Sequence, residues 1–247
     1  MSAGPYDAPG NIVLADFRKP EEFSDRAVTE IILNSGKVYS YPAAAPGLTS
    51  EVRPSREQVK IGETSGHWTA TNAGSKELIA SSSPEDEYSL FDHAERIYRP
   101  RQASWVRVGK ILPAPVDLSR HQGMGVWIYG DGQGQLMNFQ LNSPKIYDAR
   151  ADHYVIVDFK GWRYFEFVDR EAERFEDYSW PYARCIYSVY RESLGFSAIE
   201  RLNLWYNNVP VGRTVSCYLS PIKALPLVKN RISRPSITAG GRTIVFP

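Results

Sequence analysis

Apolar and polar residues alternate in short segments along most of the chain, and this alternation limits the possible folds more than any other feature. The spacing is that of a β-strand with one buried face, and turn pairs such as Asp131-Gly132 separate the segments. The segments are Ile12–Phe17, His67–Asn72, Trp105–Ile111, Gly125–Tyr129, Leu136–Asn142, His153–Phe159, Arg163–Phe167, Ala183–Tyr190, Arg201–Tyr206 and Thr214–Leu219. Helical spacing is confined to Pro84–Arg96 and Glu21–Val28. The sequence therefore predicts an all-β antiparallel sandwich with few short helices.

Composition and charge exclude several classes of function. The 247 residues carry a net charge of +1, which gives no strong attraction to nucleic acid or anionic lipid. No run of eighteen apolar residues occurs, so no membrane span is expected, and the first residues lack the features of a signal peptide. The two cysteines and four histidines lack the spacing of a disulfide framework or a zinc site. Aromatic residues, in contrast, make up 13% of the chain.

Two regions interrupt the alternating pattern and suggest how the chain is divided. Ser35–Arg56 is rich in Pro, Ala and Ser, which favours a long surface excursion. Ser233–Pro247 resembles a linker followed by the opening hairpin of another β module. We therefore expect a disordered extension at residues 1–10, a sandwich at 11–228, and the start of a following module at 229–247. Covalently linked neighbouring domains in a longer chain are the expected partners.

The glycine-rich stretch GVWIYGDGQGQLMNFQLN, Gly125–Asn142, lacks the context of a phosphate or calcium loop. A dinucleotide or phosphate loop leads into a helix, whereas a strand follows here, and Asp131 is the stretch's single acid. Asp131-Gly132 between two alternating runs instead predicts a β-hairpin. Its apolar residues would face the core, and its polar face would carry Trp127, Tyr129, Asn138 and Gln140.

Aromatic and amide side chains on one face suit the recognition of sugars. The apolar face of a pyranose stacks on a flat ring, and its hydroxyls need partners that both donate and accept hydrogen bonds, as Asn and Gln do. Trp205, between Asn203 and Asn207, repeats the pattern in a later strand. Trp127, Tyr129, Asn138 and Gln140 are therefore the candidate ligand-binding residues, with Trp205 and Asn207 as second candidates.

Several motifs in the same order resemble the galactose-binding-like jelly-roll carbohydrate-binding modules. They are NIVLADF at Asn11–Phe17, GETSGHWTATN at Gly62–Asn72, MGVWIYGDGQGQLMNFQL at Met124–Leu141, HYVIVDFKGW at His153–Trp162 and RLNLWYNNVPVGRTVSCYLSPIKAL at Arg201–Leu225. The resemblance implies a β-sandwich that binds polysaccharide, often as an accessory module of a secreted glycan-degrading enzyme. It also implies an extracellular or periplasmic location.

The resemblance bears on cofactors as well. Such modules often hold a structural calcium near the chain ends, with an acidic ligand in the last strand. The corresponding stretch here, Tyr218–Ile222, contains no acid, although Asp16 is present at the other end. Asp16 is thus the one candidate ligand for a structural calcium, and no other cofactor is expected.

An enzyme and a structural spacer are the alternative functions. His153, Tyr154, Arg163 and Tyr164 include a base, an acid and a charge neutraliser, as a jelly-roll polysaccharide lyase would need. Asp158, Glu166 and Asp169 could supply the carboxylate pair of a glycoside hydrolase. A spacer would bury Trp127 and Tyr129 beneath the chain's own loops. We expect a non-catalytic glycan-binding module, because the aromatic and amide pattern occurs twice.

Overall fold

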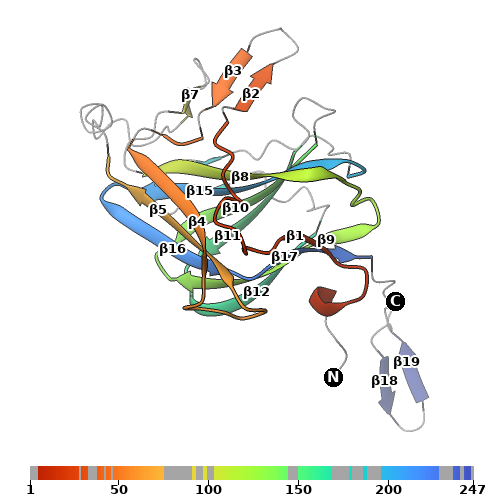
Figure 1. Cartoon of the computed structure of the whole chain (residues 1–247). Helices are drawn as coiled ribbons and strands as arrows, with labels where there is room; N and C mark the ends of the chain where they lie inside the picture. Colours follow the sequence, from red (N-terminus) through yellow and green to blue (C-terminus); the bar gives the residue numbers. More distant parts are fainter. Residues whose placement is uncertain are drawn as a thin grey trace.

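A computed structural model shows a nearly all-β chain (Figure 1). Backbone and side chains are described for residues 5–27, 43–45, 47–74, 105–143, 152–167, 196–207 and 209–227. The backbone alone is described for residues 29–32, 38–41, 91–92, 97–98, 103–104, 150–151, 168, 178–179, 186–187, 208, 236–239 and 242–245.

Two antiparallel sheets pack face to face, which confirms the predicted sandwich (Figure 1). The seven-stranded sheet contains β1 (Ile12–Ala15), β4 (Leu48–Ser55), β5 (Ser65–Asn72), β9 (His121–Asp131), β12 (Lys160–Val168), β16 (Arg213–Leu219) and β17 (Ile222–Pro226). The four-stranded sheet contains β8 (Ala103–Val116), β10 (Gln135–Asn142), β11 (Arg150–Val157) and β15 (Ile199–Pro210).

Strand order decides which side chains become neighbours. In the larger sheet β9 pairs with β12 along one edge and with β16 and β17 along the other. Beyond them β16 continues to β5 and β4, and β17 pairs with β1. In the smaller sheet the order is β11, β10, β15 and β8. Apart from β4 with β5 and β10 with β11, these neighbours are not consecutive strands, so the faces of the sandwich combine residues from distant parts of the sequence.

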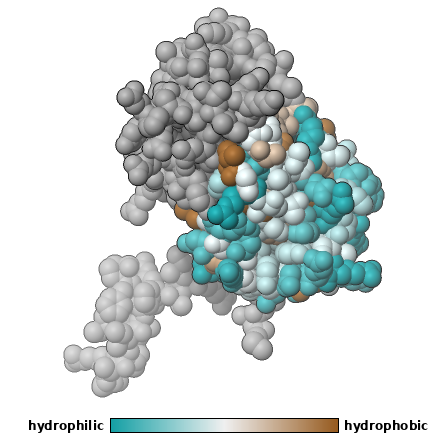
Figure 2. Space-filling model, turned by 90° about the vertical axis from the view of Figure 1, so that its left-hand side faces the viewer, coloured by the Kyte–Doolittle hydropathy of each residue, from teal (hydrophilic) through white to brown (hydrophobic). Residues whose placement is uncertain are grey.

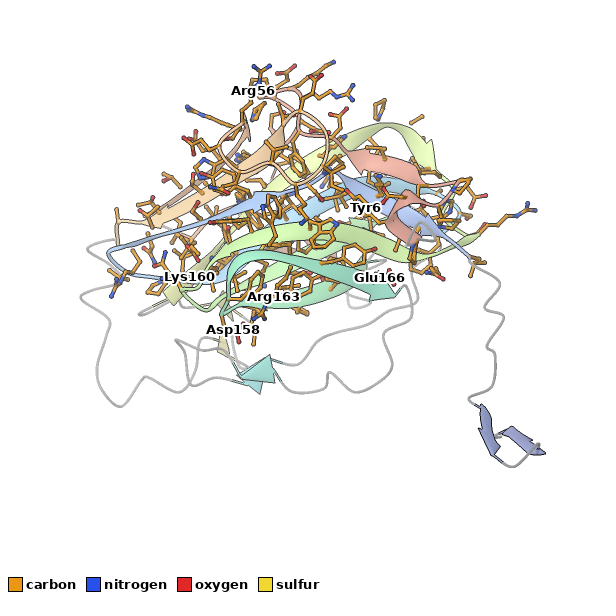
Figure 3. All side chains as sticks on the ribbon, turned by 90° about the horizontal axis from the view of Figure 1, so that it is seen from below. Tyr6, Arg56, Asp158, Lys160, Arg163 and Glu166 are labelled. Atoms are coloured by element: carbon orange, nitrogen blue, oxygen red, sulfur yellow. The ribbon has the colours of Figure 1, made fainter. Side chains whose placement is uncertain are left out.

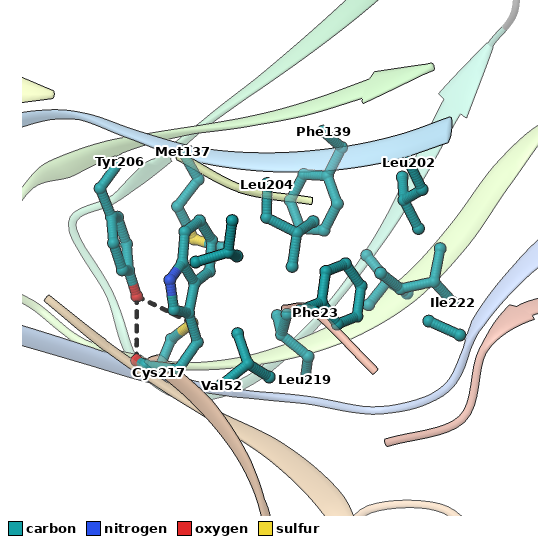
Figure 4. Packing of buried hydrophobic residues seen from close by; sticks show 14 of the residues in the cluster. Phe23, Val52, Met137, Phe139, Leu202, Leu204, Tyr206, Cys217, Leu219 and Ile222 are labelled. Carbon is teal, nitrogen blue, oxygen red and sulfur yellow. Dashed lines mark hydrogen bonds between the residues drawn. The ribbon is translucent and has the colours of Figure 1, made fainter. Parts of the chain in front are cut away.

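The core lies between the sheets and is filled by the apolar residues at the inward-facing, alternate positions of each strand. Val126 and Ile128 of β9 face Met137, Phe139 and Leu141 of β10, and all five are fully buried. These are the residues for which the alternation predicted burial. A closely packed group at one end of the core includes Tyr206, which stacks on Trp68 with ring centroids 3.8 Å apart and donates to Cys217 Sγ (3.1 Å; Figure 4).

The remaining elements include short hairpins. They are β2 (Thr29–Ile32) with β3 (Val38–Tyr41), β6 (Phe91–Asp92) with β7 (Ile97–Tyr98), β13 (Tyr178–Ser179) with β14 (Ile186–Tyr187), and β18 (Ser236–Ala239) with β19 (Arg242–Val245). The last of these is the hairpin predicted near the C-terminus. Within the described residues the single helical element is the 3₁₀ turn η1 (Pro5–Asp7), and none of their helices is long and apolar enough to span a membrane.

Two sequence predictions about these regions need correction. Residues 21–27 are not helical: they form turns and an isolated bridge between Asp25 and Gly109. Ser35–Arg56 is not a simple excursion, because β4 pairs with β5 along its full length. Pairing with the next strand along the chain supplies its hydrogen bonds, although the segment itself lacks a clear alternation. The predicted helix at Pro84–Arg96 lies largely outside the described residues, as does Cys185; Cys217 is a buried free thiol.

The described surface is mainly polar. In the view of Figure 2 its atoms are mostly hydrophilic or neutral, with small hydrophobic patches. The large apolar residues that are exposed lie on separate elements, as in Val13, Ile111 and Ile156. Scattered single apolar residues are normal on soluble surfaces.

Candidate functional site

The glycine-rich stretch does not form the predicted hairpin. β9 belongs to the seven-stranded sheet and β10 to the four-stranded sheet, and residues 131–134 carry the chain between them. Gly132 and Gly134 adopt positive φ (77° and 81°) there. The Asp131 carboxylate closes this corner by accepting hydrogen bonds from Gln133, Gln135 and the Ser216 amide (2.7–3.2 Å). The hairpin prediction is wrong because strands from elsewhere in the sequence occupy both edges of β9 and of β10.

The predicted binding residues are consequently divided between two surfaces. Trp127 and Tyr129 lie on the outer face of the seven-stranded sheet, while Asn138 and Gln140 lie on the outer face of the four-stranded sheet. The hydrophobic core separates the two pairs. Trp205 pairs directly with Asn138, so the second sequence motif joins the amides and not the first tryptophan. We call the outer face of the four-stranded sheet the polar face, and that of the seven-stranded sheet the aromatic face.

A continuous hydrogen-bond network covers the polar face. Asn203 donates to Gln140 Oε1 (3.0 Å) and Asn142 Oδ1 (2.7 Å). Gln140 and Asn138 both donate to Asp152 Oδ1 (2.7 and 2.8 Å). Asn138, Gln140 and Asn203 are at most 5% exposed. These buried amides satisfy one another and hold the half-buried carboxylate of Asp152 in a fixed position.

Two aromatic rings flank the centre of this network. Trp205 on β15 and Tyr154 on β11 are the cross-strand neighbours of Asn138, so their Cα atoms are about 10 Å apart. Both side chains are half-buried, and Trp205 Nε1 donates to Gln140 Oε1 (3.4 Å). Asn207 follows with the same parity as Trp205 and is 8% exposed. The face thus offers two rings with a row of polar groups beside them.

Beside Trp205 the polar face contains buried charge. Arg107, on β8, is 0% exposed and its guanidinium lies 5.9 Å from the Trp205 ring. It donates to Asn203 Oδ1 (3.0 Å), Asp25 Oδ2 (3.3 Å) and the Ala27 carbonyl. Arg107 and Asp25 were not predicted from the sequence, and Asn203 was placed in the pattern around Trp205 without being named a candidate binding residue. The available signal was a charged residue placed between apolar ones, as in the run Trp105–Val108.

Asp25 remains charged in this setting. Burial raises the pKa of its carboxyl, but the Ala27 amide and the guanidiniums of Arg201 and Arg107 outweigh it, and the pKa lies below its ordinary value. Burial lowers the pKa of Arg107, and the charge of Asp25 opposes that change. A fully buried arginine and a half-buried aspartate therefore depend on each other.

The aromatic face is a band of rings packed against one another. Tyr129 makes edge-to-face contacts with Trp162 (5.5 Å between centroids) and Tyr218 (5.9 Å), and Tyr218 stacks on His67 (4.3 Å). These residues occupy four adjacent strands, β12, β9, β16 and β5. Trp127 lies 5.2 Å from Tyr164 in the next row. The rings are half-buried, and they contact other rings of the same face.

The loop between β4 and β5 covers part of this band. Lys60 Nζ lies 4.6 Å above the Trp127 ring, and Tyr218 donates its hydroxyl to Glu57. Burial and the Glu57 carboxylate raise the pKa of Tyr218 to about 12. A loop of the same chain, residues 56–64, therefore covers the rings in part, as a spacer would predict.

The candidate catalytic residues do not meet. His153 is buried, with Nδ1 3.1 Å from the Phe139 carbonyl and its ring 5.5 Å from Phe167, while Tyr154 points to the polar face. Arg163 and Tyr164 lie on β12 in the other sheet, and Figure 3 shows Arg163 between Lys160 and Glu166 along that strand. The four side chains lie in different sheets or point to different sides of one sheet, so they form no common proton-transfer site.

The carboxylates also fail to form a hydrolase pair. Asp158 lies just before β12 and Glu166 near its end, which separates them by roughly 20 Å along the strand. Glycosidase carboxylates are about 5–10 Å apart. Asp169 lies outside the described residues.

Asp16 sits in a tight turn beside an internal ion pair. Its carboxylate accepts from the Arg18 amide (3.1 Å), and the neighbouring Glu22 accepts from the amides of Asp16 and Phe17 and from Lys110. No group of three or more His, Cys, Asp or Glu suited to a metal occurs in the part of the chain that the structure describes. A structural calcium held by Asp16 stays a prediction from the sequence.

Comparison with known proteins identifies the fold. No family model and no curated protein sequence matches the chain. A family 11 carbohydrate-binding module from Clostridium thermocellum, solved in complex with a β-1,3-1,4-mixed-linked tetrasaccharide, matches 90% of this chain and 99% of its own at 12% identity (TM-score 0.50). The family 11 module of the cellulase Lic26A-Cel5E from the same organism matches 91% and 99% at 10% identity (TM-score 0.48). An exo-β-agarase matches 88% of this chain and 26% of its own at 11% identity (TM-score 0.42). The chain therefore has the β-sandwich fold of carbohydrate-binding modules, as its sequence predicted.

Proposed function

We propose that the chain is a non-catalytic carbohydrate-binding module whose polar face binds a polysaccharide or oligosaccharide. The observation that carries the proposal is the row formed by Tyr154, Asn138 and Trp205, with the Asp152 carboxylate beside it. Flat rings can stack on the apolar faces of pyranoses, and fixed amide and carboxylate groups can bind their hydroxyls. The buried network holds these groups in place before the ligand arrives, which reduces the entropy lost on binding.

The aromatic face is the weaker choice for the same ligand. Its rings pack edge to face, Tyr218 and Tyr164 donate their hydroxyls to Glu57 and Glu166, and Lys60 covers Trp127. A sugar stacking on Trp127 would have to displace that lysine. Trp127 and Tyr129, the first candidates from sequence, therefore serve to test the choice of face.

The comparisons support the ligand class. A module of the same fold was solved with a bound tetrasaccharide, so this sandwich can hold an oligosaccharide. We further propose that the module belongs to a longer chain with a glycan-degrading domain and acts outside the cytoplasm, where polysaccharides are encountered. The hairpin of β18 and β19 is a second β element after the sandwich, as a neighbouring module would supply.

The test is a pair of variants, one for each face. A glycan array selects a ligand, and calorimetry then measures its affinity for the wild type, Trp205→Ala and the double variant Trp127→Ala/Tyr129→Ala. We expect Trp205→Ala to lose about 2 kcal/mol, roughly 25-fold, because it removes a stacking ring at the centre of the site. The double variant should change affinity less than about 3-fold.

The outcomes distinguish the polar face from the aromatic face as the binding site, and a glycan-binding module from a structural spacer. A loss confined to the double variant would move the site to the aromatic face. If the folded wild type binds no glycan on the array, the proposed glycan binding is refuted, and a structural spacer becomes the favoured function. Retained far-ultraviolet and near-ultraviolet circular dichroism shows that a variant is folded.

A further inference from the structure

Positive charge exceeds negative charge at one end of the polar face. Arg201 lies four residues before Trp205 on β15, opposite Asn142 on β10. Its Nε is 3.4 Å from Asp25 Oδ2, the same oxygen that Arg107 contacts at 3.3 Å. Two guanidiniums therefore share a single carboxylate, and Arg26 adds a third positive charge while donating to the Phe23 and Ser50 carbonyls. The described side chains leave this end cationic.

Arg201 is the member of this group that a ligand can reach. Its side chain is 31% exposed, whereas that of Arg107 is fully buried. Among the described residues its guanidinium contacts Asp25 through Nε, so its two amino groups are the part of the guanidinium that we assign to a ligand. Asn142 accepts from Asn203 through Oδ1, which leaves its amide NH₂ directed elsewhere. A planar guanidinium with an adjacent amide donor suits the oxygens of a carboxylate or a sulfate.

The surrounding backbone holds Arg201 in position. Asp25 and Gly109 exchange two backbone hydrogen bonds (2.9 and 3.1 Å), which lay residues 25–27 along β8. A Cβ on Gly109 would come within 3.0 Å of Asn203 Oδ1, Asp25 Oδ2 and Arg107 Nη1, so a larger residue there would displace these side chains. Because Asp25 is fixed, it orients the Nε side of Arg201 and leaves the opposite edge of the guanidinium for a ligand.

We propose that the glycan bound on the polar face is acidic, and that its carboxylate or sulfate ester binds Arg201 and Asn142. This inference rests on the proposed function and narrows it to a ligand class. Arg201 and Trp205 are about 13 Å apart along β15. The anionic group therefore lies a few sugar units from the ring that stacks on Trp205.

Matched ligand pairs test the proposal directly. The probes are polygalacturonate and its methyl ester, dextran sulfate and dextran, and carboxymethyl and hydroxyethyl cellulose, compared by affinity electrophoresis and calorimetry at low and high salt. The first and third pairs test a carboxylate, and the second tests a sulfate. In at least one pair the wild type should bind the acidic member about 10-fold or more tightly, and high salt should reduce the difference.

Variants separate a specific contact from general charge. Arg201→Gln should abolish the preference for the acidic member, and Arg201→Lys should restore it only in part, because a lysine cannot bind two oxygens in one plane. Arg53→Gln removes the same charge from an exposed position on the other face and should leave the preference intact. Asp25 keeps Arg107 as its partner in each variant, so the fold should persist.

Two results would overturn the inference while leaving the proposed function standing. One is equal binding of both members in all three pairs, with Trp205→Ala still weakening whichever glycan binds. The other is a preference that survives Arg201→Gln unchanged. Failure of Trp205→Ala to weaken binding would instead count against the proposed site as a whole.

Discussion

The two outer faces of the sandwich begin from the same sequence pattern and end as different surfaces. On the polar face, alternate residues form a hydrogen-bonded layer around Asp152, Arg107 and Asp25, with Trp205 and Tyr154 set into it. On the aromatic face, alternate residues pack ring against ring, and Tyr218 and Tyr164 donate to carboxylates of the same chain. An aromatic residue beside amides indicates a binding face only when the neighbouring strands supply further polar groups.

The largest expected effect concerns the charge buried beneath the polar face. Asp25→Ala leaves the guanidinium of Arg107, which is 0% exposed, without its carboxylate, and should lower the free energy of unfolding by about 3–5 kcal/mol. Urea denaturation measures the change. The matched control is Asp158→Ala, whose ion pair with Arg163 on the outside of β12 is largely exposed and should be worth less than about 1 kcal/mol. Equal effects of the two variants would refute a buried charge pair.

The next effect distinguishes a binding carboxylate from a structural one. Asp152→Ala removes the charged acceptor of the polar face and should weaken glycan binding by about 1.5–3 kcal/mol. Some loss of stability should accompany it, because Asn138 and Gln140 lose their acceptor. Calorimetric titration with the array-selected glycan gives the affinity, and Asp158→Ala again serves as the control. Unchanged affinity in folded Asp152→Ala would remove Asp152 from the site.

A smaller effect is expected on the aromatic face, and on stability alone. Tyr218→Phe removes the hydroxyl that donates to Glu57 while keeping the ring between Tyr129 and His67. The free energy of unfolding should fall by about 1 kcal/mol, and glycan affinity should not change. Thermal unfolding and calorimetry on the same sample measure both. A loss of affinity here would show that the two faces are not functionally distinct.

The smallest effect uses pH to distinguish the faces. Burial lowers the pKa of His67, so the unfolded chain takes up more protons as the pH falls through about 6.5, and stability should decrease there. The pKa of Asp25 is also lowered, so its contribution is complete above about pH 4 and is lost below that value. Urea unfolding of the wild type and His67→Gln from pH 7.5 to 3 measures both steps. In His67→Gln the decrease in stability at about pH 6.5 should disappear, and the decrease below about pH 4 should remain.

Much of the fold follows from the sequence, because burial parity is a local property. The alternation correctly placed Val126 and Ile128 inside and Trp127 outside. It could not show that β9 and β10 belong to different sheets, because a strand's pairing partners are set by contacts distant in sequence. The site was predicted in part for the same reason. Asn138, Gln140 and Trp205 do share a face, but Asp152 and Asp25 join them through strand pairing and loop contacts that no local pattern reveals, and Arg107 was marked only by its place between apolar residues.

The pairing of β1 with β17 has a mechanical consequence. Ile12 lies beside Ala224 and Ala15 beside Ile222. The first and last strands of the sandwich, β1 and β17, therefore meet at one edge of the seven-stranded sheet. Tension applied to the chain on both sides would therefore open this short pair one hydrogen bond at a time, instead of shearing all its bonds together. The weakest point under load lies in the seven-stranded sheet, whereas the polar face belongs to the other sheet. Tension could then begin to detach β1 while the residues of the polar face keep their arrangement.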